Sequence, residues 1–298
     1  MTPCPKFLSR FIAIFLFCLI AAQGAVHAEA PRHLRIIWIG DATSEATVSW
    51  STLEKGSDHK VYYRPRNQDQ PAPSFQTSQT HQSGPYTGGE GHYHHVALNG
   101  LKPDTLYEIQ VASDGDRSDA VLFRTAPRDP NKPVAILSGG DSRSGHKARV
   151  EVNKRMAELC EDPTVIAFAH GGDFIQNGRK WSQWDRWLKD HQHTRHSDGR
   201  VLPIIPTRGN HDKGVLFDEI FAFPGGKGKN YFTTRIGPSI SLITLNTSTS
   251  AGGEQLQWLK KQLPVERKNS RWLLVQYHRP IYPAVKSPGR AKSFWAPL

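Results

Sequence analysis

The sequence has few cysteines and, beyond its N-terminus, no long hydrophobic run. Two of its three cysteines, Cys4 and Cys18, lie in the first 28 residues, so only Cys160 remains in the rest of the chain. One cysteine cannot form an intrachain disulfide, which excludes the small secreted folds that disulfides hold together. A membrane-spanning helix needs about 20 apolar residues, and no stretch after residue 30 approaches that length. We therefore expect a soluble protein that depends on a hydrophobic core.

The N-terminal segment has the pattern of an export signal. Lys6 and Arg10 precede an apolar run over residues 11–22, and small residues follow up to Ala30. A charged start, a short apolar run and small residues near a cleavage point are typical of a signal peptide. We predict that residues 1–28 are removed and that the mature protein is secreted or periplasmic.

Positive charge exceeds negative charge, with 38 Lys and Arg against 27 Asp and Glu and a net charge of +11. The basic residues are spread along the chain, and they do not alternate with aromatic residues as in surfaces that bind single-stranded nucleic acid. The excess charge favours acidic substrates or surfaces, and no specific nucleic-acid binding is expected.

Residues 31–127 have the pattern of an all-β domain. Short runs of alternating apolar and polar residues, such as 46–50 and 107–111, are separated by turn residues, which predicts a β-sandwich. Residues 101–107, Leu-Lys-Pro-Asp-Thr-Leu-Tyr, resemble a corner of fibronectin-type-III-like domains. The segment 126–132, rich in proline and charge, is interpreted as a linker.

From residue 133 onward the pattern changes to strands that alternate with helices. Apolar runs at 134–138, 165–169 and 201–205 predict buried strands, and helical stretches follow the first two. This indicates a layered α/β domain over residues 133–298. In such folds, ligands bind at the carboxyl ends of the strands. Each run ends in a polar motif at that edge: Gly140-Asp141, Gly172-Asp173 and Gly209-Asn210-His211-Asp212.

These residue types suit a pair of metal ions that act on a phosphate ester. A carboxylate can bridge two cations, and amide oxygens and imidazole nitrogens complete such a shell without adding negative charge. Two cations about 3.5–4 Å apart neutralise the phosphate and activate water. The alternative is that the Asp and Asn residues only cap helices. Capping explains neither His211 nor His278.

Four motifs resemble, in order, the first four of the five motifs of calcineurin-like metallophosphoesterases, most closely the purple-acid-phosphatase-like members. They are Gly140-Asp141, Gly172-Asp173, Gly209-Asn210-His211-Asp212 and Val275-Gln276-Tyr277-His278. The resemblance runs from about residue 133 to the C-terminus, and a preceding sandwich is the usual companion of the acid-phosphatase branch. It implies a hydrolase that cleaves phosphate esters by attack of a metal-bound hydroxide.

The resemblance also implies a role for each of five residues. Asp141 would bind a first metal ion, and Asp173 would bridge both ions. Asn210 and His278 would bind the second ion. His211 would hydrogen-bond the phosphate or donate a proton to the leaving alkoxide.

The chain departs from the family pattern at two positions near this site. Arg143 stands where the family has His or Gly, and Gln176 stands where the purple branch has Tyr. Without a tyrosinate ligand we expect no ferric charge-transfer colour, and Fe, Zn and Mn all remain candidates for the two ions. Arg143 could contact the substrate phosphate, which suits its bidentate fork, or it could form a structural salt bridge.

The last family motif, Gly-His-x-His, does not follow His278. The final residues, 295–298, resemble the stretch that leads into that motif, so we expect a truncated domain with one histidine missing from each metal ion. The alternative function is therefore a catalytically impaired or inactive exported binding protein. Residues 91–94, Gly-His-Tyr-His, have the same letters, but they lie in the predicted sandwich, where alternation along a strand explains them.

Two clusters of residues and one further histidine, His170, lie outside these motifs. Three tryptophans at helical spacing are predicted to pack a helix on the sheet: Trp181, Trp184 and Trp187. Three histidines lie where that helix ends, either at a solvated helix end or in a loop that faces the substrate: His191, His193 and His196. His170, just before the second Gly-Gly-Asp, either supports a metal ligand through a hydrogen bond or is structural.

Overall fold

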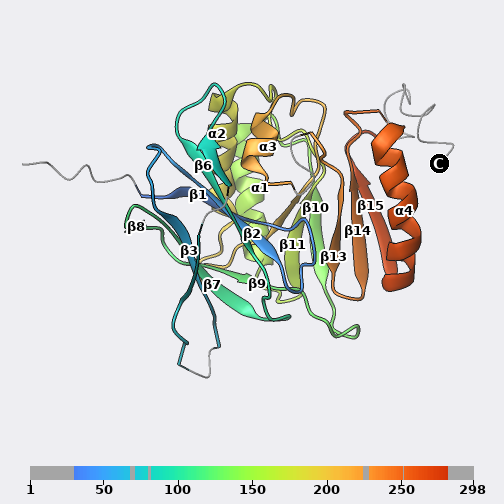
Figure 1. The fold of residues 1–298 in the computed structure, drawn as a ribbon, viewed down its shortest axis with the longest axis horizontal. Coiled ribbons are helices and arrows are strands. Elements are labelled where there is room, and N and C mark those ends of the chain that lie inside the picture. Colours follow the sequence, from blue (N-terminus) through green and yellow to red (C-terminus); the bar gives the residue numbers. More distant parts are fainter. Residues whose placement is uncertain (1–29, 68–70, 80–81, 224–227, 251, 281–298) are drawn as a thin grey trace, which may run out of the picture.

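The computed structural model describes residues 30–67, 71–79, 82–223, 228–250 and 252–280. The predicted signal peptide and the C-terminal residues 281–298 lie outside these ranges. The described chain forms an N-terminal β-sandwich and a second unit of mixed sheets and helices, with helix α4 on the side away from the sandwich (Figure 1). No helix among the described residues is long and apolar enough to cross a membrane.

The sandwich consists of two packed sheets. One contains β1, β2, β6 and β5, and the other contains β4, β3, β7 and β8, with β9 paired to β7. The strands are β1 (Arg32–Ile37), β2 (Ala46–Thr52), β3 (His59–Pro65), β4 (Gln76–Gln79), β5 (Gln82–Pro85), β6 (His92–Leu98), β7 (Leu106–Ser113), β8 (Asp116–Arg117) and β9 (Val121–Arg124). The alternation expected from the sequence therefore produces the predicted all-β domain.

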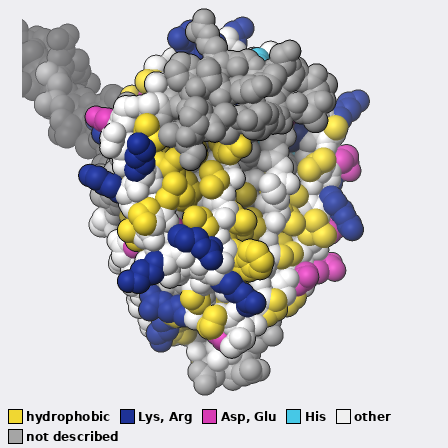
Figure 2. Space-filling view, turned by 90° about the vertical axis from the view of Figure 1, so that its right-hand side faces the viewer, with side chains coloured by type: hydrophobic (Ala, Val, Ile, Leu, Met, Phe, Trp, Pro, Cys, Tyr) yellow, Lys and Arg dark blue, Asp and Glu magenta, His cyan; other side chains and the backbone are white. Residues whose placement is uncertain are grey.

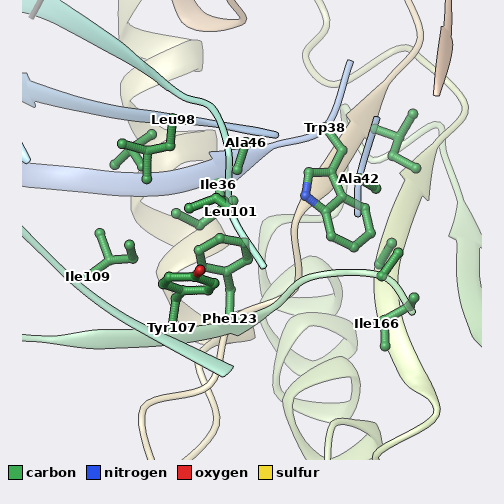
Figure 3. Packing of buried hydrophobic residues seen from close by; sticks show 14 of the residues in the cluster. Ile36, Trp38, Ala42, Ala46, Leu98, Leu101, Tyr107, Ile109, Phe123 and Ile166 are labelled. Atoms are coloured by element: carbon green, nitrogen blue, oxygen red, sulfur yellow. The ribbon is translucent and has the colours of Figure 1, made fainter. Parts of the chain in front are cut away.

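Apolar side chains from both sheets meet between them and form the core of the sandwich. Figure 3 shows Ile36 and Leu101 beside the rings of Tyr107 and Phe123, which are all buried. The Tyr107 hydroxyl accepts a hydrogen bond of 2.8 Å from the backbone N–H of Lys102. This hydrogen bond stabilises the fibronectin-type-III-like corner that the sequence of residues 101–107 predicted.

The second unit begins with parallel strands β10, β11 and β12, and continues with a sheet in which β13 is antiparallel and β15 parallel to β14. Its elements are β10 (Ala135–Gly139), α1 (His146–Leu159), β11 (Val165–His170), α2 (Trp181–His191), a 3-10 turn (Gln192–Thr194), β12 (Ile204–Pro206), α3 (Leu216–Ile220), β13 (Phe232–Ile236), β14 (Ile240–Leu245), α4 (Gly253–Asn269) and β15 (Trp272–Tyr277). The helix predicted over 146–159 has these bounds, whereas the strand predicted over 201–205 begins only at Ile204.

Strand β1 joins the two units into one sheet. It lies antiparallel to β2 and parallel to β12, so the strand order is β10-β11-β12-β1-β2-β6-β5. The Trp38 N–H donates to the Ile204 carbonyl at 3.0 Å. The buried guanidinium of Arg35 donates to the Ile220 carbonyl through Nε at 3.1 Å and Nη2 at 2.6 Å. The linker expected at 126–132 therefore connects units that already share backbone hydrogen bonds.

The tryptophan stripe of α2 packs as predicted. Trp184 and Trp187 are buried with Phe174, and the ring centroids of Phe174 and Trp187 are 5.0 Å apart. Trp181 joins the same cluster and stacks on Tyr86 of the sandwich, with centroids 4.0 Å apart. This aromatic cluster supports the loops that follow β10 and β11.

Strand β15 is the least buried strand of the second unit. Trp272, Leu274 and Val275 are 60%, 43% and 44% exposed, although β14 beside it is almost wholly buried. Figure 2 shows the corresponding side of the molecule, where hydrophobic side chains are interspersed with Lys and Arg. Within the described residues, β15 thus presents apolar side chains to the surface.

Candidate metal centre

The residues that the sequence predicts as metal ligands come from strand ends that meet at one edge. Asp141 follows β10, Asp173 follows β11 and Asn210 follows β12, while His278 follows β15. Ligand atoms of Asp141, Asp173 and His278 all lie within 4.8 Å of one another. Two carboxylates and an imidazole are ligands that Fe, Zn and Mn accept, so this donor set fits a metal ion.

Both aspartates have unusual backbone conformations. The φ angles of Asp141 and Asp173 are 53° and 57°, in the left-handed region that residues other than glycine adopt rarely. The Asp141 N–H donates to the Gly172 carbonyl at 2.9 Å, which ties the two loops together. Strained conformations of this kind cost about 1–3 kcal/mol each and cluster at functional sites. The loops therefore give up stability to direct two carboxylates at one point.

Asp173 is the central group of the cluster. Its side chain is buried, and His278 Nε2 lies 3.2 Å from its Oδ1. Burial alone would raise the pKa of Asp173, but hydrogen bonds from His278 and from the His211 backbone N–H, at 2.9 Å, hold it below its ordinary value. Asp173 is therefore an ionised carboxylate in a buried position, which suits it to bind cations.

His278 is oriented by a backbone contact. Its Nδ1 donates to the Gly171 carbonyl at 2.9 Å, which leaves Nε2 facing Asp173. Burial would lower the pKa of His278, but the hydrogen bonds with Asp173 and Gly171 raise it overall. A histidine held through one nitrogen with the other directed at the site has the arrangement found in metal ligands.

His211 lies at the margin of the same cluster. Its Nδ1 donates to the Gln176 carbonyl at 2.7 Å, and its Nε2 is 4.0 Å from Asp173 Oδ2. The side chain of Gln176, at the position of the family tyrosine, is exposed. His211 is therefore fixed through one nitrogen and presents the other at the open side of the site.

Asp212 was not assigned a role from the sequence, yet it holds two of the loops together. Its buried carboxylate accepts backbone N–H groups of Asp173 and Gly209, both at 2.8 Å, and of Phe174 at 2.9 Å. Burial raises the pKa of Asp212 to about 6 despite these hydrogen bonds. Its place at the end of the Gly-Asn-His-Asp motif was the only sequence signal.

Two arginines contact the oxygens of the expected ligands. Arg143 Nη1 donates to Asp141 Oδ1 and, at 2.8 Å, to Asp173 Oδ2. Arg143 thus forms salt bridges with both carboxylates, and its contact with substrate stays a prediction. Arg279, which the sequence did not suggest, donates through Nε to Asn210 Oδ1 at 3.1 Å.

His170 supports the loop that carries Asp141. Its Nδ1 accepts the Gly172 N–H at 3.2 Å, so Nε2 carries the proton and donates to Ser142 Oγ at 2.8 Å. The Trp187 indole N–H also donates to this oxygen, at 3.0 Å. Burial lowers the pKa of His170 to about 3, and the neighbouring His191 and His278 act in the same direction. The ring thus stays neutral and contacts the loops rather than the ligand atoms.

Other histidines lie apart from the cluster. His94 is buried in β6, and both its ring nitrogens have partners: Nε2 is 2.8 Å from Thr52 Oγ1 and Nδ1 is 2.7 Å from Ser83 Oγ. The prediction of a solvated helix end is wrong for His191, which is buried and stacked on Trp187 with ring centroids 4.9 Å apart. Tertiary packing of α2, invisible in the local sequence, accounts for this difference.

The close approach of the loops makes Gly209 sensitive to substitution. A Cβ there would lie 2.2 Å from both the backbone N and Oδ1 of Asp173. We expect Gly209→Ala to displace Asp173, to abolish metal binding and to cost about 1–3 kcal/mol of stability, measured by calorimetric metal titration and thermal unfolding. The matched control is Gly139→Ala, because its Cβ would meet only Phe168 at 3.5 Å. Equal metal affinity in the two variants would contradict this geometry.

Comparisons with known proteins agree with this architecture. Residues 31–125 match the purple acid phosphatase N-terminal domain, and residues 140–297 match the calcineurin-like phosphoesterase family. Phosphoenolpyruvate phosphatase of Allium cepa is 24% identical over 266 residues, which cover 82% of this chain and 53% of that protein. Purple acid phosphatase 15 of Arabidopsis thaliana is 23% identical over 240 residues, with 66% and 43% covered. The chain spans about half the length of these curated relatives.

A solved structure supports the same fold. That of a purple acid phosphatase from yellow lupin (Lupinus luteus) seeds has a TM-score of 0.70 at 18% identity, and the match covers 85% of this chain and 52% of the lupin chain. The resemblance predicted from four short motifs is confirmed, since residues 140–297 take in more than half of the sequence. The protein belongs to the calcineurin-like phosphoesterase family and carries a purple-acid-phosphatase N-terminal domain in front of its phosphoesterase domain.

Proposed function

We propose that this chain hydrolyses phosphate esters in a metal-dependent reaction. The observation that carries the proposal is the convergence of Asp141, Asp173 and His278 at strand ends, with ligand atoms within 4.8 Å of one another. The family membership and the names of the phosphatases that it resembles support the same substrate class.

The residues present suit two cations, which we propose to be Fe, Zn or Mn. Asp141 and Asp173 would hold the first, and Asp173, Asn210 and His278 would hold the second. When bound, such ions neutralise phosphate charge and activate water. The carboxylate, amide and imidazole donors do not select among these metals.

His211 and Arg143 are the proposed contacts to substrate. His211 Nε2 is on the open side of the site, and the hydrogen bond from Nδ1 to the Gln176 carbonyl keeps the ring in place. In that position it can hydrogen-bond a phosphate oxygen or give a proton to the leaving oxygen. The guanidinium of Arg143 suits a phosphate because its N–H groups form two parallel hydrogen bonds.

We also propose that the protein is exported. We infer it from the charged start, apolar run and small residues within the first 30 residues, which are typical of a secretory signal. The proposal therefore places the enzyme outside the cytoplasm, in a periplasm or secreted.

Turnover of p-nitrophenyl phosphate tests the activity. We expect hydrolysis after loading with Zn²⁺, Mn²⁺ or Fe²⁺, its loss on removal of the ion with EDTA, and its return on reloading. Stoichiometric metal binding without turnover would sink the proposal and would instead favour the exported binding protein.

A further inference from the structure

The guanidinium of Arg143 contacts two of the three residues that converge at the candidate metal site. One nitrogen, Nη1, donates both to Asp141 Oδ1 and to Asp173 Oδ2. The Asp173 side chain is 2% exposed, that of Arg143 28% and that of Asp141 65%. Arg143 therefore contacts both the buried carboxylate of Asp173 and the exposed carboxylate of Asp141.

Two carboxylates this close repel each other unless a positive charge lies between them. Arginine stays protonated at every relevant pH, so Arg143 supplies that charge without a metal ion. The other oxygen of Asp173 already accepts the His211 N–H and faces His278 Nε2. Arg143 holds the second oxygen of Asp173, Oδ2, and one of the two oxygens of Asp141. A cation placed between the two carboxylates therefore competes with Arg143 for these oxygens.

The backbone beside Arg143 is fixed, whereas its side chain can leave. Ser142 accepts hydrogen bonds at its carbonyl from Arg149 Nη1, at 2.6 Å, and at its hydroxyl from Trp187 and His170. The partly exposed Arg143 side chain borders solvent. Exchange of a cation for the guanidinium thus requires only a rotation of the Arg143 side chain.

We propose that Arg143 is an internal counter-ion that competes with metal ions for Asp141 and Asp173 and thereby sets the metal affinity of the centre. This proposal rests on the proposed function only in one respect, because it assumes that the same site binds metal ions. Displaced from the carboxylates, the guanidinium becomes free for the substrate phosphate. Competition of this kind lowers metal affinity, because each binding event breaks two ion pairs.

The test compares the Zn²⁺ or Mn²⁺ dissociation constants of four proteins by calorimetric titration of metal-free full-length chain. Close charge pairs at partly buried positions have coupling energies that correspond to roughly tenfold or more. We therefore expect Arg143→Gln to bind metal on the order of tenfold more tightly than the natural protein. Arg143→Lys keeps the charge but loses the fork, so its affinity should fall between the two. Arg186→Gln, which removes an exposed charge on α2, should leave the affinity unchanged.

Thermal unfolding gives a second measurement. Without metal, Arg143→Gln should lower Tm because two carboxylates lose their counter-ion, and saturating metal should remove the difference. Equal or weaker metal binding by folded Arg143→Gln would overturn the proposal. Loss of a merely structural arginine would weaken metal binding, and loss of a purely substrate-binding arginine would leave it unchanged. If Arg143→Gln does not fold even with metal, Arg143→Lys decides: affinity equal to or below that of the natural protein overturns the proposal.

Turnover measurements separate this inference from the proposed function. If Arg143→Gln binds metal more tightly but the natural protein does not hydrolyse p-nitrophenyl phosphate, the counter-ion role is supported and the proposed enzymatic function is wrong. If the natural protein hydrolyses it and the metal affinity of Arg143→Gln is unchanged, the enzymatic function is supported and the counter-ion role is wrong.

Discussion

Asp173→Ala should abolish metal binding and lower phosphate-ester turnover by at least about 100-fold. Changes in groups that only support metal ligands already cost about 10–100-fold, and Asp173 is the residue proposed to contact both ions. Its carboxylate is also the shared partner of His278, Arg143 and the His211 backbone. The measurements are metal content after dialysis against a stoichiometric supply of Zn²⁺ or Mn²⁺, and hydrolysis of p-nitrophenyl phosphate.

Two further variants make this result specific. Asp173→Asn keeps the shape of the side chain and an acceptor for the His211 N–H, but it lacks the charge, so it should lose metal while remaining folded. His92→Ala changes the Gly-His-Tyr-His sequence of the sandwich and should retain full metal content. Metal retention in both Asp173 variants would show that the ions bind elsewhere, and metal loss in His92→Ala would point to β6.

Acidification should destabilise the protein strongly as the pH falls below about 6.5, the ordinary histidine value. Burial lowers the pKa of His33, His94 and His170 to about 3, and that of His191 to about 4. Each is neutral in the folded protein but takes up a proton on unfolding. The unfolded state therefore binds more protons below the unfolded pKa, and stability is lost as the pH falls toward the folded values.

The expected loss is large because four groups act in the same direction. Each contributes on the order of 2 kcal/mol between about pH 6.5 and pH 5, against a total stability of about 5–15 kcal/mol. Asp212, whose pKa burial raises to about 6, and His278, whose pKa is also raised, act in the opposite direction. Urea unfolding at a series of pH values measures how the free energy of unfolding changes with pH. His191→Phe is the matched variant, because it keeps the stacking on Trp187, removes one titrating group and should flatten the slope. A stability independent of pH over this interval would contradict the burial of these rings.

The sequence predicts the elements of this fold better than their long-range pairing. Residues 146–159 show helical periodicity and form α1 with those bounds, because local periodicity determines that choice. The pairing of β1 with β12 joins residues 37 and 204, and nothing in either apolar run specifies the other as its partner. The sequence indicated a linker at 126–132 between the two units, but it did not indicate the sheet that they share through β1 and β12.

The same distinction applies to the candidate site. Asp141, Asp173 and His278 were identified because their residue types and positions after strands follow a known chemical pattern, and the structure brings them together. The contacts of Asp212 and Arg279 depend on how separate loops meet, which a motif does not encode. Likewise, His191 follows a helix in sequence, but its stacking on Trp187 is decided by tertiary packing.

The strand shared by the two units has a consequence for access to the site. Enzymes with two separate domains can close around a substrate by bending at a hinge between them. Here β1 is hydrogen-bonded to β2 on one side and to β12 on the other, and Arg35 fastens the same strand to the end of α3. Rotation of the sandwich against the α/β unit would break these bonds. The sandwich is therefore a rigid wall beside the α/β unit. Under the proposed function, selection among phosphate esters of different size falls to side chains around the site rather than to domain closure.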